Sequence, residues 1–190
     1  MRSPASDADT RFTYDDFVDF PDDGNWHELI DGAHYVTPSP DVRHQATVVR
    51  LVVQIANHLQ HHPIGRVFVA PLDVVLSNHD VVEPDLIYVA GDQADILTRK
   101  NIQGPPALVV EVLSPRTRKR DAQTKRRLFE QTGVREYWLV DPELDTVQVL
   151  RVSPDGKLVR VVELSSEADE TLTTPLLPGC AIALRYIVSG

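Results

Sequence analysis

The stretch Ala107 to Ser114, ALVVEVLS, places one acid in the middle of an otherwise apolar run. Glu111 has a valine on each side, and its neighbours further along are valine and leucine. Such a run is typical of a strand covered on both faces of a sheet, where an unpaired charge would cost several kcal/mol. We therefore expect Glu111 to have a partner, which is either a divalent cation or a basic side chain.

A second acidic stretch precedes this one. In VEPDLIY (82–88), Asp85 follows Pro84 at the start of an apolar run. A carboxylate at this strand end, together with Glu111, suits a hard cation such as Mg²⁺ or Mn²⁺. Glu83 shares the face of Asp85 by strand alternation and is the weaker candidate ligand. Taken alone, Pro-Asp is equally typical of a turn or a strand start.

The segment after Pro115 predicts a helix from about Lys119 to Gly133. Asp121, Lys125 and Leu128 lie at i, i+4 and i+7, so they share one helix face, and Leu128 indicates that this face points inward. Lys125 is therefore expected to point toward the sheet. Asp121 either orients Lys125 or caps the helix start, and the sequence leaves both open.

The rest of the chain predicts further short elements. A short helix opens at Thr13, a hairpin turns at Asp31-Gly32, and an apolar stripe at spacings of three and four predicts a helix over 43–60. The expected strands are RVFVA (66–70), LDVVLS (72–77), PDLIYVA (84–90), ALVVEVLS (107–114), EYWLVDP (136–142), TVQVLRV (146–152), KLVRVVEL (157–164) and CAIAL (180–184). Residues 78–80 and 91–104 are expected as connections.

Composition limits the class of protein. The 190 residues, 42% hydrophobic, suit one domain over 11–190 after a polar, disordered lead-in at 1–10. No long apolar run and no signal-peptide pattern is present, so we expect a cytoplasmic protein with no membrane partner. A net charge of −9 argues against coating nucleic acid by bulk attraction, and the single cysteine excludes a thiolate-rich zinc site.

Four segments in order resemble a known family: HELIDG, EPDLIYV, VVEVLSPRTRKRDAQTK and GVREYWLVDP. They are similar to the PD-(D/E)xK nuclease superfamily and more closely to the Uma-two family of putative restriction endonucleases, over about residues 12–187. The resemblance implies an α/β (α+β) fold with a restriction-endonuclease-like core of order α-β-β-β-α-β. An N-terminal hairpin and C-terminal β additions would complete the fold.

The resemblance also implies a set of site residues. Asp85 and Glu111 would bind Mg²⁺ (or Mn²⁺), with the backbone carbonyl of Val112 as a further ligand. The superfamily pattern puts a lysine at position 113, where this chain has leucine, so the lysine role passes to Lys125. Glu28, in HELIDG, resembles an additional acid near such sites.

Supporting residues follow from the same comparison. His44 resembles a family position, although its place one turn before Val48 fits a core histidine almost as well. Asp121 and Tyr137 are possible supports, with a purely structural role favoured for Tyr137. The residues expected to contact backbone phosphates are Arg116, Arg118, Lys119 and Arg120.

The function expected from these residues is metal-dependent hydrolysis of DNA phosphodiester bonds. The metal would activate a water, which Lys125 would orient or activate. Duplex cleavage commonly needs two active sites, which favours a homodimer. The alternatives are a nuclease-fold module that binds nucleic acid or protein without cleaving, and a hydrolase of RNA or of a small phosphorylated molecule.

Overall fold

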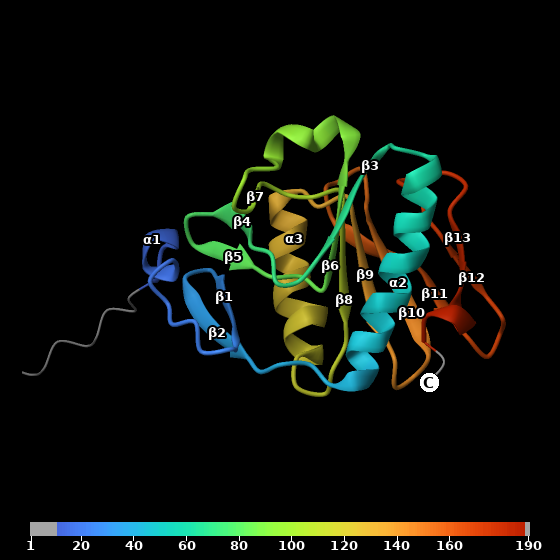
Figure 1. The fold of residues 1–190 in the computed structure, drawn as a ribbon, viewed down its shortest axis with the longest axis horizontal. Helices are drawn as coiled ribbons and strands as arrows, with labels where there is room; N and C mark the ends of the chain where they lie inside the picture. The colour runs from blue at the N-terminus through green and yellow to red at the C-terminus, as the bar shows by residue number, and fades with distance from the viewer. Residues whose placement is uncertain (1–10, 189–190) are drawn as a thin grey trace, which may run out of the picture.

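The computed structural model describes residues 11–188 (Figure 1), so the expected lead-in at 1–10 lies outside the described residues. Its centre is a six-stranded mixed sheet. In spatial order the strands are β11 (Leu158–Ser165), β10 (Thr146–Val152), β9 (Glu136–Asp141), β8 (Leu108–Val112), β6 (Leu86–Ala90) and β3 (Gly65–Val69). Only β8 and β9 pair in parallel within this sheet, and a helical crossover connects them.

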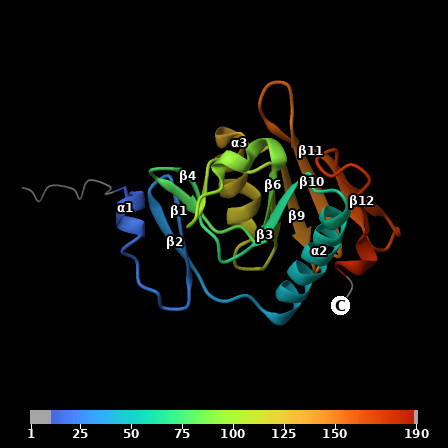
Figure 2. The ribbon, with the colours of Figure 1, turned by 45° about the horizontal axis from the view of Figure 1, so that its top comes forward.

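Helix α2 (Val42–His61) lies on one face of this sheet and α3 (Arg126–Thr132) on the other, as the two views in Figures 1 and 2 show. A π-helical segment, η2 (Arg120–Lys125), leads directly into α3. Gly133 ends α3 in the left-handed conformation, with φ of 91°. Within residues 11–188, no helix has the length and apolar character needed to cross a membrane.

Alternation along the central strands assigns side chains to the two faces. Val110 of β8 and Trp138 of β9 belong to the core under α2, whereas Val109 and Tyr137 belong to the core under α3. Glu111 is two residues from Val109, so it projects toward α3 and η2. The sheet therefore delivers this acid to the helix that carries Lys125.

A second, five-stranded sheet lies on the α3 side of the molecule (Figure 1). In spatial order its strands are β2 (Ala33–Thr37), β1 (Trp26–Ile30), β5 (Asp80–Val82), β4 (Val74–Ser77) and β7 (Ile102–Gln103). The expected hairpin is the β1–β2 pair, in which Asp31 and Gly32 both have positive φ, as a type I′ turn requires. The short helix α1 (Tyr14–Phe17) precedes it and is capped by Thr13, as expected.

The predicted core order is confirmed as α2-β3-β6-β8-α3-β9. The segment LDVVLS forms β4, but this strand belongs to the second sheet. The prediction that 78–80 and 91–104 are only connections was wrong, because they contribute to β5 and β7 and contain the 3-10 helix η1 (Gly91–Ile96). Strands of three and two residues are too short to show alternation in a sequence.

The C-terminal additions also differ from the expectation in one respect. The β10–β11 hairpin extends the main sheet, as expected. The segment CAIAL instead forms β13 (Ala181–Ala183), which pairs with an unpredicted β12 (Thr171–Thr173) in a separate two-stranded sheet before the 3-10 turn η3 (Leu184–Tyr186). This small sheet closes the core beside α2 through Leu172 and Ile182.

Candidate active site

A pocket of about 350 Å³ opens where the two sheets, the N-terminal end of α2 and η2 meet. Its floor is made of buried polar side chains: Glu28 from β1, Asp85 before β6, Glu111 from β8, and Asp121 and Lys125 from η2. Its exposed rim comes from two short loops, 38–41 and 114–117. Residues far apart in the chain are thereby gathered around one small volume.

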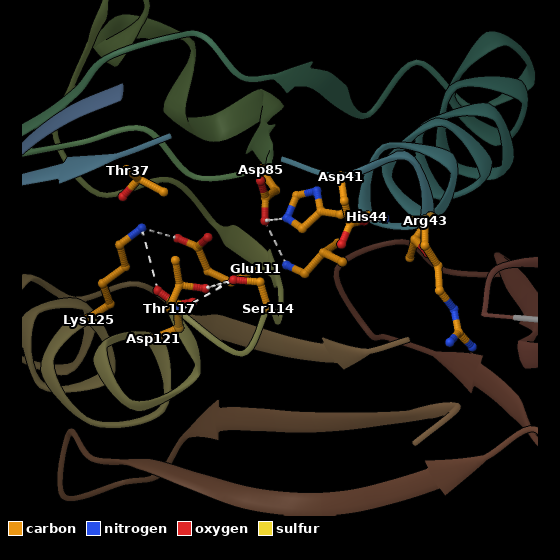
Figure 3. A network of polar contacts seen from close by, with 12 residues as sticks. Thr37, Asp41, Arg43, His44, Asp85, Glu111, Ser114, Thr117, Asp121 and Lys125 are labelled. Carbon is orange, nitrogen blue, oxygen red and sulfur yellow. Dashed lines mark hydrogen bonds and ion pairs between the residues drawn. The ribbon is translucent and has the colours of Figure 1, made fainter. Parts of the chain in front are cut away.

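Lys125 reaches this floor from η2, and Figure 3 shows its amine directed at Glu111. Its Nζ is 2.8 Å from Glu111 Oε1, 2.7 Å from Glu28 Oε1 and 3.8 Å from Asp121 Oδ1. Burial alone would lower the pKa of the amine, but the charges of Glu111, Glu28 and Asp121 outweigh burial and raise the pKa above its ordinary value. Lys125 is therefore a permanent cation, and it is the basic partner expected for Glu111.

Asp85 is held by two donors from the main sheet and α2. Its Oδ2 accepts the backbone N–H of Val112 at 2.7 Å and lies 3.2 Å from His44 Nε2. Burial lowers the pKa of His44, but the hydrogen bond and charge of Asp85 outweigh burial, so the net pKa is raised. His44 is therefore a buried histidine in direct contact with a candidate metal ligand, which joins the two interpretations that the sequence left open.

The floor contains more acidic than basic side chains. Four carboxyl groups, those of Glu28, Asp85, Glu111 and Asp121, surround the single fully buried amine of Lys125. Burial raises the pKa of Glu111 well above its ordinary value; Lys125 opposes this shift, and the charges of Asp121, Asp85 and Glu28 reinforce it. An additional cation would relieve this repulsion.

The donor set of the floor suits Mg²⁺ or Mn²⁺. Glu28 Oε2 and Asp121 Oδ1 are buried without a hydrogen bond among the described residues. Within residues 11–188, no group of three or more His, Cys, Asp or Glu side chains is arranged to hold a metal by itself. Mg²⁺ keeps several of its waters and commonly uses only one or two carboxylates. The three residues predicted as its ligands, Asp85, Glu111 and Val112, all line this pocket.

Two hydrogen bonds to the backbone of Asp121 stabilise the helical segment that carries Lys125. The Tyr137 hydroxyl donates to the Asp121 backbone carbonyl at 3.2 Å, and burial, followed by the surrounding carboxylates, raises the pKa of this phenol so that it stays a neutral donor. The Asp121 N–H donates to the Thr117 carbonyl at 3.0 Å. Asp121 therefore lies inside the helical run, and the alternative that it caps the helix start was wrong.

Of the four basic residues predicted to contact phosphates, two form ion pairs and two are exposed. Arg118 pairs with Asp141 and Glu143, while Arg120 turns inward, 3.4 Å from Glu28 Oε2 and 2.6 Å from the Thr37 hydroxyl. Arg116 and Lys119 are exposed and make no ion pair within residues 11–188. A phosphate contact by any of the four predicted residues stays a prediction, and the geometry favours Arg116 and Lys119.

The sequence identifies Glu83 as a weaker candidate ligand but does not predict its pairing with Asp73. Glu83 lines the pocket, its N–H donates to Glu28 Oε1 at 3.1 Å, and its carboxyl hydrogen-bonds to that of Asp73. Burial first, and Asp73 second, raise the pKa of Glu83 to about 7. Asp73 carried no signal in the sequence, because it precedes a strand whose sheet membership was not predicted.

The Glu83 pair predicts a specific pH dependence of stability. The folded-state pKa is raised above the unfolded value, so the folded chain binds more protons between about pH 4.5 and 7 and loses stability as the pH rises through this range. Glu83→Gln should therefore increase the free energy of unfolding at pH 8 by about 2 kcal/mol, after allowance for partial exposure, with little change at pH 4.5. Urea unfolding in EDTA measures this difference.

The control for this experiment is Glu167→Gln, because Glu167 is exposed and outside the pocket. It should leave the pH profile of stability unchanged. Equal destabilisation by Glu83→Gln at both pH values would contradict a strained carboxyl pair.

The chain is similar to a known protein family and to a solved structure. The model of a family named Uma2, described as "Putative restriction endonuclease", matches residues 14–185. A solved structure from Anabaena variabilis ATCC 29413, described as a putative nuclease belonging to DUF820, is similar with a TM-score of 0.76 and 22% sequence identity, covering 94% of this chain and 98% of that chain. No curated protein matches this chain.

Proposed function

The chain belongs to the Uma2 family of putative restriction endonucleases, and we propose that it is a metal-dependent endonuclease. In this proposal it hydrolyses DNA phosphodiester bonds with a metal-activated water. The observation that carries the proposal is the meeting of Asp85, Glu111 and Lys125 on the floor of one pocket. In such hydrolysis carboxylates bind the metal and a cation stabilises the developing charge. The pocket brings together two carboxylates from adjacent strands and one buried cation.

The metal ligands in this proposal are Asp85, Glu111 and the backbone carbonyl of Val112. A bound Mg²⁺ or Mn²⁺ would supply positive charge at the reacting phosphate and lower the pKa of a coordinated water. Asp85 is oriented for this task by His44 and by the Val112 N–H, which together fix the position of its Oδ2. Such hydrogen bonds from surrounding groups tune the affinity of a metal site.

Lys125 acts as a cation rather than as a base. Because its pKa is raised by three carboxylates, it holds its proton, donates to the attacking water and stabilises the negative charge that develops on the phosphate. Glu28 keeps the amine in place through its 2.7 Å contact. Arg116 at the rim, and Lys119 beyond it, are exposed and would contact backbone phosphates of the bound DNA.

The test is cleavage by the purified chain with Mg²⁺ or Mn²⁺. We expect fragments from DNA substrates with either ion, no fragments in EDTA, and recovery when metal is added back, as read on denaturing gels. Glu111→Gln, purified identically, controls for a contaminating nuclease. Parallel RNA and small phosphodiester substrates separate the other hydrolase classes.

Each alternative has its own signature in this assay. Binding of DNA without cleavage under either ion would replace the enzyme with a binding module. Cleavage that persists in EDTA would contradict the metal-dependent mechanism. The homodimer and the cytoplasmic location expected from the sequence stay predictions.

A further inference from the structure

The candidate metal ligands lie deep below the surface of the pocket. Asp85 and Glu111 are each only 4% exposed. The volume above them, about 350 Å³, falls near the lower end of the ~300–1,000 Å³ typical of pockets for small molecules. A scissile phosphate must enter this volume to reach the carboxylates, so the strand that carries it must extend below the surface of the protein.

The pocket walls are short and hydrogen-bonded. The loop Pro38-Ser39-Pro40-Asp41 carries two prolines, which restrict its backbone, and Asp41 accepts the His44 N–H at 2.8 Å as the cap of α2. Across the pocket, the Ser114 and Thr117 hydroxyls are 3.0 Å apart and fix the loop that contains Pro115. Walls held in this way are expected to keep their positions when substrate approaches.

Trp26 is the aromatic side chain of the pocket. It lies at the start of β1, two residues from Glu28 and therefore on the same face of the strand, and it is half-buried. Its indole lines the same volume as Pro38 and Pro40. Base–aromatic stacking is the main sequence-tolerant way in which proteins hold unpaired bases.

Charge at the rim is too sparse for binding dominated by the DNA backbone. The whole chain carries a net charge of −9, and Arg118 and Arg120 are engaged in ion pairs. Along the segment 116–120, only Arg116 and Lys119 are left exposed without an ion pair among the described residues. Affinity for duplex DNA rises with the number of neutralised phosphates, so two contacts leave most of the binding to other interactions.

We propose, resting on the nuclease function proposed above, that the pocket takes an unpaired nucleotide stacked on Trp26, so that the substrate class is single-stranded or unpaired DNA rather than intact duplex. Trp26 is the specificity-determining residue in this inference. The phosphate of the stacked nucleotide is thereby placed over Asp85 and Glu111 at the pocket floor.

Intrinsic fluorescence tests this inference without any turnover. The chain has two tryptophans, and Trp138 is 0% exposed with its Nε1–H bonded to Glu136. Titrating a short oligothymidylate into the protein in EDTA should therefore quench Trp26 emission. A blunt duplex of equal length should bind more weakly, and the single-strand affinity should fall with salt at a log–log slope of only about −1 to −2.

Variants assign the interaction to Trp26. By fluorescence anisotropy of a labelled oligothymidylate, Trp26→Ala should weaken binding about tenfold, while Trp26→Phe should keep affinity within about threefold and abolish the quenching. Because the phenylalanine variant keeps an aromatic ring in the wall, it also controls for folding. Tyr186→Ala removes an exposed aromatic side chain that does not line the pocket and should change nothing.

Several results would overturn the inference: duplex bound as tightly as single strand, unchanged affinity in Trp26→Ala, or no binding of either oligonucleotide. The cleavage assay separates this failure from failure of the proposed function. Preferential binding and cutting of duplex would leave the nuclease proposal standing and remove the single-strand inference. Trp26-dependent binding of single strands without metal-dependent cleavage would do the reverse.

Discussion

Lys125→Met should reduce the rate of DNA cleavage about 100- to 1,000-fold and lower the free energy of unfolding by about 3–5 kcal/mol. The buried amine of Lys125 faces Glu28, Glu111 and Asp121. Methionine has a similar length but no charge, so it leaves these carboxylates uncompensated in a buried site. Cleavage kinetics and urea unfolding measure the two effects.

The matched control is Arg127→Met on the same helix. Arg127 is exposed, so its loss should change stability by no more than about 0.5 kcal/mol and leave cleavage near the wild-type rate. Full activity of the Lys125 variant would remove the lysine from the mechanism. Unchanged stability would mean that the three carboxylates are protonated or otherwise compensated in the folded chain.

Lys125→Met is expected to affect stability as well as chemistry because of a contact that the sequence does not predict. The helix-face argument predicts that Lys125 points inward, and the structure confirms it. It does not predict the contact with Glu28, which lies 97 positions earlier in a different sheet. Lys125 thus ties the second sheet to the main one, and its removal affects folding as well as chemistry.

The elements that the sequence predicts correctly are those with enough residues to show a period. The long stripe of α2, the Asp-Gly hairpin and the apolar strands β6, β8 and β9 all appear where expected. β5, β7 and β12 have only two or three residues each, and pairing with distant strands defines them. Local patterns contain no information on such long-range pairing.

The same limit applies to the site. Spacing places Glu111 and Lys125 toward each other because the strand and the helix are consecutive in the chain. Arg120 was expected to contact backbone phosphates, but it lies in the π-helical turn η2 and contacts Glu28 and Thr37. A widened turn displaces some side chains from their α-helical directions, whereas Lys125 keeps the inward direction that the spacing predicts.

Asp85→Asn should weaken Mn²⁺ binding by about tenfold or more and abolish detectable cleavage, while the fold is retained. The asparagine oxygen can still accept the Val112 N–H, now at 2.7 Å from Asp85 Oδ2, so the local backbone keeps its partner. What disappears is one negative charge among the four carboxyl groups of the floor. Calorimetric titration with Mn²⁺ measures the affinity without knowledge of the substrate.

Stability of the metal-free chain provides a second readout. The charge of Asp85 repels Glu111, so at a pH where His44 is neutral Asp85→Asn should leave the free energy of unfolding in EDTA equal or higher. Asp85 also raises the pKa of His44, so the variant should lose stability below the pKa of that imidazole. Glu167→Gln is the control, since it removes an exposed carboxylate outside the pocket and should keep the Mn²⁺ affinity. Equal Mn²⁺ binding by wild type and Asp85→Asn, together with lost stability, would reassign the acids of the floor to a buried ion-pair network and favour the non-cleaving module.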